Sequence, residues 1–355
     1  MSDKRKILVT GGTGFIGSHT VVELIGKGYD VIIADDLSNS RLEVVDAIRE
    51  ISKGILPLFI RIDLCDRNAT LELFQHHKPD AVIHFAAKKL VGESVSNPLL
   101  YYRNNIDSLL NVIEGAMSIG CHDLVFSSSC TVYGQPDVLP VNEFAPLKKA
   151  ESPYGNTKKI AEDILTDTVQ ATAMKVISLR YFNPVGAHHS ALIGEYPQGA
   201  PANLMPIITQ VAIGKRESFS VFGTDYNTSD GTCVRDYIHV VDVAKAHVAA
   251  IERLHEGGSS ERFEVFNLGT GIGISVFGMI NAFEKVNGLK LNYKITDRRP
   301  GDVEQVWADT SLANKVLNWK AEKSLEEMVA SAWAWEKALA AKTNAQLSGK
   351  GVVKS

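Results

Sequence analysis

Short apolar runs recur through the first half of the chain, and each is followed by a stretch in which apolar residues have helical spacing. Six of these runs are predicted strands, at residues 6–12, 30–36, 57–64, 80–87, 123–129 and 175–183. β-branched runs that alternate with helical stretches are typical of a parallel sheet covered by helices on both faces. The pattern therefore predicts an α/β fold built on a doubly wound parallel sheet.

The regular alternation ends after Arg180, and residues 184–206 are rich in glycine and proline. Later elements are expected as a helix at 205–215, a strand at 218–223, a strand and helix at 237–251 and a strand at 264–271. Because strand patterns return late in the chain, we expect a smaller α/β domain that is interleaved with the first. The predicted boundaries are 1–182 plus about 236–268 for the first domain, about 183–235 plus 269–342 for the second, and 343–355 for a flexible tail.

Three glycines stand directly after the first predicted strand and open the following helix. Gly11, Gly14 and Gly17 have the spacing of a dinucleotide-binding turn, in which the backbone approaches a pyrophosphate at the helix N-terminus. A glycine-rich turn without a ligand is the alternative interpretation. A second glycine-rich segment, 267–275, resembles another phosphate loop, but we prefer a strand-to-helix turn with Ser275 as the helix N-cap.

Acidic residues at the ends of the next two strands favour a dinucleotide. Asp35 ends the second strand 21 residues after Gly14, the usual separation for a carboxylate that binds a ribose diol. Asp36 follows, where a site for a 2′-phosphate would tend to have a basic residue. The sequence therefore predicts a Rossmann-type site for NAD rather than NADP. Asp63, after the third strand, is expected to hold the adenine amino group, although a solvated loop aspartate has the same pattern.

Composition and charge narrow the kind of partner. The formal net charge is −4 and the basic residues are scattered, so we expect a small-molecule ligand and neither nucleic acid nor a membrane surface. No apolar run reaches the ~20 residues needed to span a bilayer, and a cytoplasmic protein is expected. The four cysteines are far apart, and the adjacent His188 and His189 lack an evident third ligand. We therefore expect reduced cysteines and no metal site.

A candidate catalytic pair stands where a predicted loop becomes a helix. Tyr154 and Lys158 are four residues apart, a spacing that chance can supply but that places both side chains on one helix face. Lowering a tyrosine pKa of about 10 by about 3 units needs roughly 4 kcal/mol of preferential phenolate stabilisation, and a nearby lysine can contribute to this. Ser129 is expected at the sheet edge where ligands bind. Ser127 and Ser128 are more simply explained by hydrogen bonding at the strand end.

Seven motifs are spread over most of the chain. They are GGTGFIG at 11–17, HFAAKKLVGES at 84–94, SSSCTVYG at 127–134, YGNTK at 154–158, RYFNPVGAH at 180–188, NLMP at 203–206 and GTCVRDYIHV at 231–240. With them the chain resembles the extended short-chain dehydrogenase/reductase family, and within it the nucleotide-sugar 4-epimerases. The resemblance implies bound NAD and reversible 4-epimerisation of UDP-glucose and UDP-galactose through a 4-keto intermediate that rotates within the site.

The resemblance also assigns roles to individual residues. Tyr154 would act as base and acid, Lys158 would tune it and hold the nicotinamide ribose, and Ser129 would hydrogen-bond the sugar hydroxyl. Further NAD contacts are implied at Phe15, Ile16, Asn39, Leu64, Phe85, Ala86, Lys89, Asn104 and Phe182. Further substrate contacts are implied at Thr131, Asn183, Asn203, Leu204, Phe222, Arg235, Arg299 and Asp302. The two arginines would bind the diphosphate, because a planar guanidinium forms paired charged hydrogen bonds.

Two positions separate this chain from related enzymes. Family members that dehydrate or decarboxylate nucleotide sugars have acidic residues where this chain has Cys130 and Thr131, so dehydration is disfavoured. Val306 stands where some members have a bulky tyrosine, and in the family a small residue leaves room for a 2-acetamido group. We therefore expect some activity on UDP-GlcNAc and UDP-GalNAc.

Two other functions are compatible with the sequence. A UDP-glucuronate 4-epimerase would need an extra cationic or hydroxyl partner for the carboxylate, and one sequence does not locate it. A non-catalytic, NAD-binding regulatory protein could dispense with Tyr154, Lys158 and Ser129, all of which are present. The resemblance further implies a homodimer formed through helices near residues 98–117 and 154–172.

Overall fold

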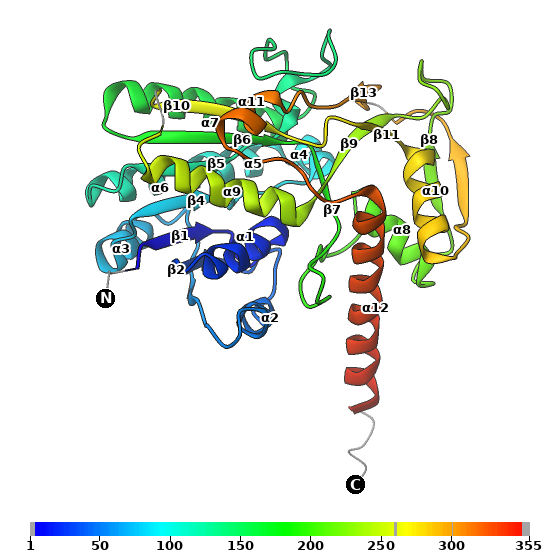
Figure 1. Ribbon diagram of the computed structural model, residues 1–355, viewed down its shortest axis with the longest axis horizontal. Coiled ribbons are helices and arrows are strands. Elements are labelled where there is room, and N and C mark those ends of the chain that lie inside the picture. The colour runs from blue at the N-terminus through cyan, green and yellow to red at the C-terminus, as the bar shows by residue number, and fades with distance from the viewer. Residues whose placement is uncertain (1–3, 259–260, 300, 350–355) are drawn as a thin grey trace.

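The largest sheet has seven parallel strands in the order β10-β6-β5-β4-β1-β2-β3 (Figure 1). The computed structural model that contains it describes residues 4–258, 261–299 and 301–349. The strands are β1 (Lys6–Thr10), β2 (Asp30–Asp35), β3 (Leu58–Arg61), β4 (Ala81–His84), β5 (Asp123–Ser127), β6 (Lys175–Tyr181) and β10 (Phe263–Leu268). Each of the six predicted runs contains one of these strands, and the doubly wound parallel fold is confirmed.

Alternate residues of the central strands enter two different cores. Ile7 and Val9 of β1 pack into one core, whereas Leu8 between them packs into the other. The first core includes residues of α1 (Phe15–Gly26), α2 (Glu43–Ile51), α9 (Val240–His255) and α11 (Ser311–Val316). The second includes residues of α3 (Arg67–His77), α6 (Ser108–Ser118) and α7 (Pro153–Ala171). Burial on both faces explains why these strands are apolar at nearly every position.

Shorter helical pieces lie between these elements. They are α4 (Val91–Ser96), α5 (Pro98–Tyr102), a π-helical turn (Arg103–Asp107) that leads into α6, and a 3₁₀ turn (Cys130–Tyr133) after β5.

A second region has its own sheets and its own core, and Figure 1 shows it on the side away from α3. One sheet joins β7 (Asn183–Val185), β9 (Val234–His239), β11 (Gly273–Ser275) and β13 (Gln305–Val306), and a second pairs β8 (Phe219–Phe222) with β12 (Tyr293–Thr296). The core between them includes residues of α8 (Leu204–Ala212), α10 (Val276–Asn287) and α12 (Leu325–Gly349).

The chain passes between the two regions more than once. The segment of about 236–268, which we assigned to the first domain, is divided: β9 pairs in the smaller sheet, whereas α9 packs on the first core and β10 pairs with β6. A run of apolar residues predicts a strand without specifying which sheet it joins, and for this reason the sequence did not reveal the division. Helix α12 continues past residue 343 to Gly349, and the rest of the predicted tail, 350–355, lies outside the described residues.

The second glycine-rich segment, 267–275, is a turn whose backbone amides donate hydrogen bonds to the buried carboxylate of Asp236. The backbone amides of Thr270 and Gly271 donate to Asp236 at 2.8 and 3.0 Å, and Ser275 caps α10 by accepting from the amide of Gly278 at 2.9 Å. Asp236 thus occupies amides that a phosphate could have used, in agreement with the predicted turn.

Candidate active site

The turn between β1 and α1 requires glycine for steric reasons. Gly11 has a positive φ of +67°, and a Cβ on it would lie 2.9 Å from the backbone nitrogen of Ala86. A Cβ on Gly17 would lie 2.3 Å from the carbonyl oxygen of Gly11, so this glycine lets the helix approach the strand. Gly14 is the N-cap of α1 and has no side chain to cap the helix. The first-turn amides of α1 therefore form a cradle suited to an anion.

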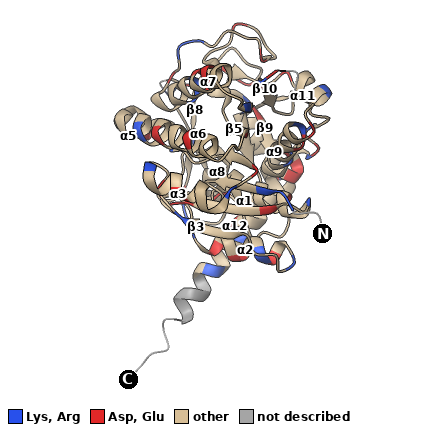
Figure 2. Ribbon diagram, turned by 90° about the vertical axis from the view of Figure 1, so that its left-hand side faces the viewer, with Lys and Arg blue, Asp and Glu red and all other residues tan. Residues whose placement is uncertain are grey.

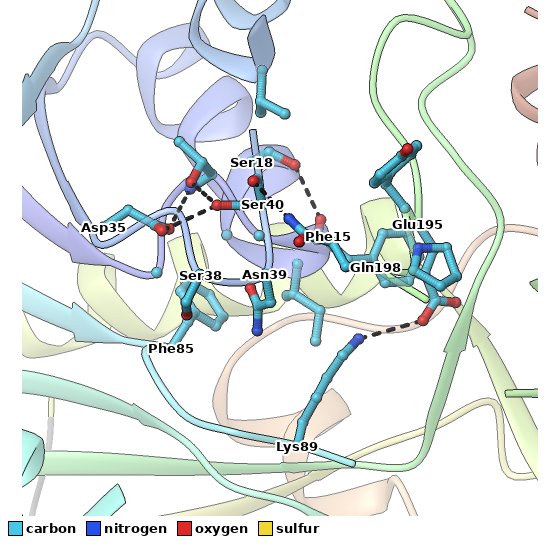
Figure 3. Close-up of a pocket in the computed structure, with 18 of the residues that line it drawn as sticks. Phe15, Ser18, Asp35, Ser38, Asn39, Ser40, Phe85, Lys89, Glu195 and Gln198 are labelled. Carbon is cyan, nitrogen blue, oxygen red and sulfur yellow. Dashed lines mark hydrogen bonds and ion pairs between the residues drawn. The ribbon is translucent and has the colours of Figure 1, made fainter. Parts of the chain in front are cut away.

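Asp35 at the end of β2 is held rigidly at the wall of the neighbouring cavity. Its carboxylate accepts hydrogen bonds from the amides of Thr13 and Leu37 at 3.1 and 2.9 Å. It also accepts from the Ser40 hydroxyl at 3.1 Å, the contact that Figure 3 shows. Asp36 also lines this cavity. The second carboxylate places negative charge where a 2′-phosphate would need a cation, which agrees with the preference for NAD.

A cavity of about 470 Å³ brings together the predicted cofactor residues. Those that line it are Gly11, Gly14, Phe15, Ile16, Gly17, Asp35, Asn39, Asp63, Leu64, Phe85, Ala86, Lys89, Asn104, Tyr154 and Lys158. Phe182 does not line it: this side chain is buried in a small core with Val132, Tyr133 and Val306. Residues far apart in sequence thus converge at the carboxyl ends of the central strands, where ligands bind in open α/β sheets.

Part of the cavity wall was absent from the prediction. Residues 194–198, which we refer to as the strap, extend from the second region to the dinucleotide site. They contact the loop after β2 and the loop after β4. Lys89 forms an ion pair with Glu195 at 3.3 Å, and Gln198 donates to the carbonyl of Ser40 at 3.0 Å (Figure 3). The strap lies in an irregular segment, and irregular segments carry no periodicity from which such contacts can be read.

Two further contacts hold the strap. The Arg41 guanidinium lies 3.7 Å from the centre of the Tyr196 ring and donates to its hydroxyl. On the other side, the indole nitrogen of Trp335 in α12 donates to the carbonyl of Glu195 at 2.9 Å. The strap is therefore fixed to the loop after β2 and to the second region.

The candidate catalytic pair begins a well-defined helix. Ser152 is the N-cap of α7 and accepts from the amide of Gly155 at 3.1 Å, and Pro153 occupies the first turn. Tyr154 and Lys158, one turn apart, are 7 % and 4 % exposed. The Lys158 ammonium donates to the carbonyl of Ser127 at 2.7 Å and lies 4.7 Å from the centre of the Phe126 ring. The helix start thus delivers both side chains to the end of β5.

Burial dominates the electrostatics of this pair. It raises the pKa of Tyr154 well above its ordinary value, although a hydrogen bond with Ser129 acts in the opposite direction. Burial also lowers the pKa of Lys158 to about 8, and the charge of Glu162 opposes that change. The nearby lysine alone therefore does not give Tyr154 a low pKa, contrary to the simplest form of the sequence argument.

The predicted substrate residues fall into separate groups. Arg299 forms an ion pair with Asp302 at 2.6 Å and lies over the ring of Phe222. Arg235 belongs to another group: it is the register partner of Val306 across β9 and β13.

Other predicted substrate residues lie after β5, in β7 and at the start of α8. The Ser129 hydroxyl accepts from the amide of Thr131 at 3.3 Å. Asn203, just before Leu204 at the start of α8, donates to Glu195 of the strap at 2.7 Å, and Asn183 opens β7. Of all the predicted substrate residues, Asn203 is the one that lines the 470 Å³ cavity.

Acidic and basic residues are mixed on the described elements, as Figure 2 shows for α2 and α9. Within residues 4–258, 261–299 and 301–349, no helix has the length and apolar character needed to cross a bilayer. No cluster of three or more His, Cys, Asp or Glu side chains suited to a metal ion occurs among these residues.

The parallel sheet, the glycine turn with Asp35 and the buried Tyr154–Lys158 pair define an NAD-binding protein of the short-chain dehydrogenase/reductase class. A family model described as GDP-mannose 4,6 dehydratase matches residues 8–332. A UDP-glucose 4-epimerase of Bacillus subtilis (strain 168) is 50% identical over 331 residues, 93% of this chain and 96% of the relative. The chain therefore belongs to the UDP-glucose 4-epimerase family.

Solved structures agree with this assignment. A UDP-glucose 4-epimerase from Stenotrophomonas maltophila, with bound NAD and formylated UDP-arabinopyranose, has a TM-score of 0.91 and 47% identity, covering 95% of this chain and 99% of its own. A less similar structure is the UDP-Glc/GlcNAc 4-epimerase of Campylobacter jejuni, with a TM-score of 0.81 and 36% identity over 94% of this chain and 99% of its own.

Proposed function

We propose that this protein is an NAD-dependent 4-epimerase that interconverts UDP-glucose and UDP-galactose through a 4-keto sugar. The observation that carries the proposal is the buried Tyr154–Lys158 pair, which lines the same cavity as the dinucleotide-binding turn and has Ser129 hydrogen-bonded beside it. The similarity to 4-epimerases along nearly the whole chain supports it. Because the reaction has no net redox change, the cofactor needs to stay bound between turnovers.

The residues of the site fit NAD. Because Gly11 and Gly14 have no side chain, the pyrophosphate could approach the backbone there and accept hydrogen bonds from the first-turn amides of α1. Asp35 would hold a ribose diol. When bound, NAD⁺ supplies the acceptor for the hydride at C4 of the sugar and a positive charge near Tyr154.

Tyr154 would remove the proton of the sugar 4′-hydroxyl and return it when the epimer forms. Burial raises the pKa of this tyrosine, so it needs positive charge nearby to act as a base at neutral pH. Lys158, with a pKa of about 8, is protonated at neutral pH. Its charge, the hydrogen bond from Ser129 and the charge of the cofactor would together oppose the effect of burial.

Substrate selection would depend on the second region. Arg235 of β9 and Arg299, which follows β12, would bind the diphosphate of the UDP-sugar, because a planar guanidinium forms paired charged hydrogen bonds with phosphate oxygens. We extend the substrates to UDP-GlcNAc and UDP-GalNAc, because Val306 is a small residue packed beside Phe182 and because the similar Campylobacter jejuni protein is a UDP-Glc/GlcNAc 4-epimerase.

A homodimer and a cytoplasmic location belong to the same proposal. Apolar side chains on α4 to α6 are exposed, among them Val95 at 63%, Leu99 at 74% and Met117 at 42%, which supports an interface on these helices.

All four cysteines lie among the described residues and are free, which is typical of a reducing compartment and supports the cytoplasmic location.

Product analysis tests the activity directly. The purified holoenzyme is incubated separately with UDP-galactose, UDP-GalNAc and UDP-glucuronate, and the products are separated by chromatography. We expect UDP-glucose from the first and UDP-GlcNAc from the second. Failure with UDP-galactose would disprove the proposed function, whereas failure with UDP-GalNAc alone would limit it to the sugars without an acetamido group.

A further inference from the structure

A buried carboxylate lies one helical turn beyond Lys158 and is not explained by NAD or substrate binding. The Glu162 side chain is 3% exposed and forms an ion pair with Arg180 of β6 at 2.5 Å. It also accepts hydrogen bonds from the hydroxyls of Ser128 at 2.6 Å and Ser178 at 2.8 Å. The carboxylate therefore links helix α7 to the end of β5 and to β6.

The end of β5 contacts three successive turns of α7. Residues 127–129 contact three α7 residues that are four positions apart; Ser127 contributes its backbone carbonyl, whereas Ser128 and Ser129 contribute their hydroxyls. The pairs are the Ser127 carbonyl with Lys158 at 2.7 Å, the Ser128 hydroxyl with Glu162 at 2.6 Å, and the Ser129 hydroxyl with Tyr154. Along residues 127–129 the contact of Ser128 with Glu162 lies between the other two, and along α7 Glu162 lies one turn beyond Lys158, so this contact adds a third point at which the strand end is held against the helix.

We propose that Glu162 is a positioning residue for the reaction: it holds the end of β5 against α7 so that Ser127 and Ser129 meet Lys158 and Tyr154. The inference rests on the proposed function, since it concerns how that catalytic pair is placed. Ser128, the residue directly after β5, transmits the effect, because its hydroxyl donates to Glu162.

The charge of Glu162 has a second consequence for Lys158. It favours the protonated lysine, whereas burial favours the neutral form. The other titratable groups around the lysine are His84 of β4, whose pKa burial lowers to about 3, Tyr154 on α7, and Arg180 of β6 behind the carboxylate. His84 is thus neutral in the working pH range, and Glu162 is the negative charge that supports Lys158.

The structural alternative is that Glu162 only compensates the charge of Arg180. Buried ion pairs often contribute little net stability relative to apolar packing, although removing one partner is costly. Arg180 also donates to the Tyr133 hydroxyl at 2.9 Å, so this arginine has a second partner in the core. A test therefore needs readouts that respond to the catalytic pair and not only to folding.

The first variant is Glu162→Gln, which keeps an acceptor for Ser128 and removes the charge. Without the carboxylate, Lys158 loses its proton at lower pH, so we expect the alkaline fall of kcat to move down by about one pH unit or more. A ¹⁵N-lysine NMR titration of the holoenzyme, with Lys158→Met to assign the signal, measures the same shift without the reaction.

The second variant is Ser128→Ala, which keeps the charge and removes the tie to β5. We expect kcat to fall about tenfold or more with little change in the position of the alkaline limb. Glu264→Gln is the matched control, because it removes the partly buried Arg253–Glu264 ion pair, whose side chains are 16% and 11% exposed. This control should lower the Tm and leave kcat and its pH profile unchanged.

The outcomes separate the two proposals. If Glu162→Gln lowers the Tm as Glu264→Gln does while kcat, its pH profile and the Lys158 titration stay as in the wild type, Glu162 is structural and the inference is overturned. If Glu162→Gln does not fold, wild-type kcat in Ser128→Ala overturns it. A wild-type protein without epimerase activity would disprove the proposed function, and the NMR titration would then decide the role of Glu162.

Discussion

Burial and charge act on the Tyr154 hydroxyl in opposite directions. Its spacing from Lys158 suggested a tyrosine whose pKa is lowered by its neighbour, yet burial raises it, and burial also lowers the pKa of the lysine to about 8. A tyrosine in this setting is protonated at neutral pH until further positive charge approaches. We infer that base catalysis by Tyr154 depends on the bound cofactor as well as on Lys158.

Replacing Tyr154 by phenylalanine tests whether its hydroxyl transfers the proton. Tyr154→Phe removes the proton-transfer group and keeps the ring, so we expect kcat to fall by about 10²-fold to 10⁴-fold. NAD should remain bound, because the variant leaves the glycine turn and Asp35 intact. Turnover of UDP-galactose and the NAD content of the purified protein are the measurements, and near-normal turnover would remove Tyr154 from the mechanism.

The pH dependence of kcat follows from Lys158. Burial places its pKa at about 8, so the ammonium is present below this value and is lost as the pH rises through it. We expect kcat to decrease on the alkaline side near this pH because the neutral lysine no longer stabilises the phenolate. A pH–rate profile on saturating UDP-galactose checks this, with the Tm recorded at each pH to exclude unfolding. A flat profile up to pH 10, about two pH units higher, would contradict it.

Some elements of the site are fixed by residues close to them in the sequence, whereas others are fixed by contacts with distant residues. The turn between β1 and α1 and the start of α7 are encoded within a few residues, through Gly11, Gly17 and the Ser152 N-cap. The strap at 194–198 is the opposite case, since its contacts to Ser40, Arg41 and Trp335 join distant parts of the chain.

The strap leads to a prediction about cofactor retention. Tyr196→Ala removes the stacking with Arg41 that closes the strap over the loop after β2, so NAD should dissociate about tenfold faster or more. Dilution of the holoenzyme followed by timed separation of free NAD measures the rate. Tyr293→Ala, at an exposed tyrosine of β12, is the matched control and should retain NAD as the wild type does. Equal rates for both variants would show that the strap does not retain the cofactor.

At the scale of the whole molecule, the exposed apolar surface of α4 to α6 leads to a prediction of dimerisation. Combining Leu99→Glu and Leu110→Glu places two charges on side chains that are 74% and 40% exposed, so we expect a dimer to become a monomer. Sedimentation velocity gives the mass of each form. Ile295→Glu, at an isoleucine of β12 that is 60% exposed, should leave the mass unchanged. A wild-type monomer would contradict the prediction.

The sequence by itself determined the features that depend on neighbouring residues. The six first-half strands, the glycine turn, Asp35 at the end of β2 and the shared helix face of Tyr154 and Lys158 all follow from spacings that backbone geometry imposes. These features were sufficient for the parallel fold and for the part of the cavity wall formed by the glycine turn, Asp35, Tyr154 and Lys158.

Only the tertiary structure decided which distant segments meet. It placed β9 in the smaller sheet, buried Phe182 in a core away from the cavity, closed the strap over the site and joined Glu162 to the end of β5. Each of these contacts links residues that are separated in the chain, and hydrophobic periodicity contains no information about the partner across such a gap. The same burial also reversed the expected effect on the Tyr154 pKa, because the loss of solvation depends on the packed surroundings and not on the spacing to Lys158.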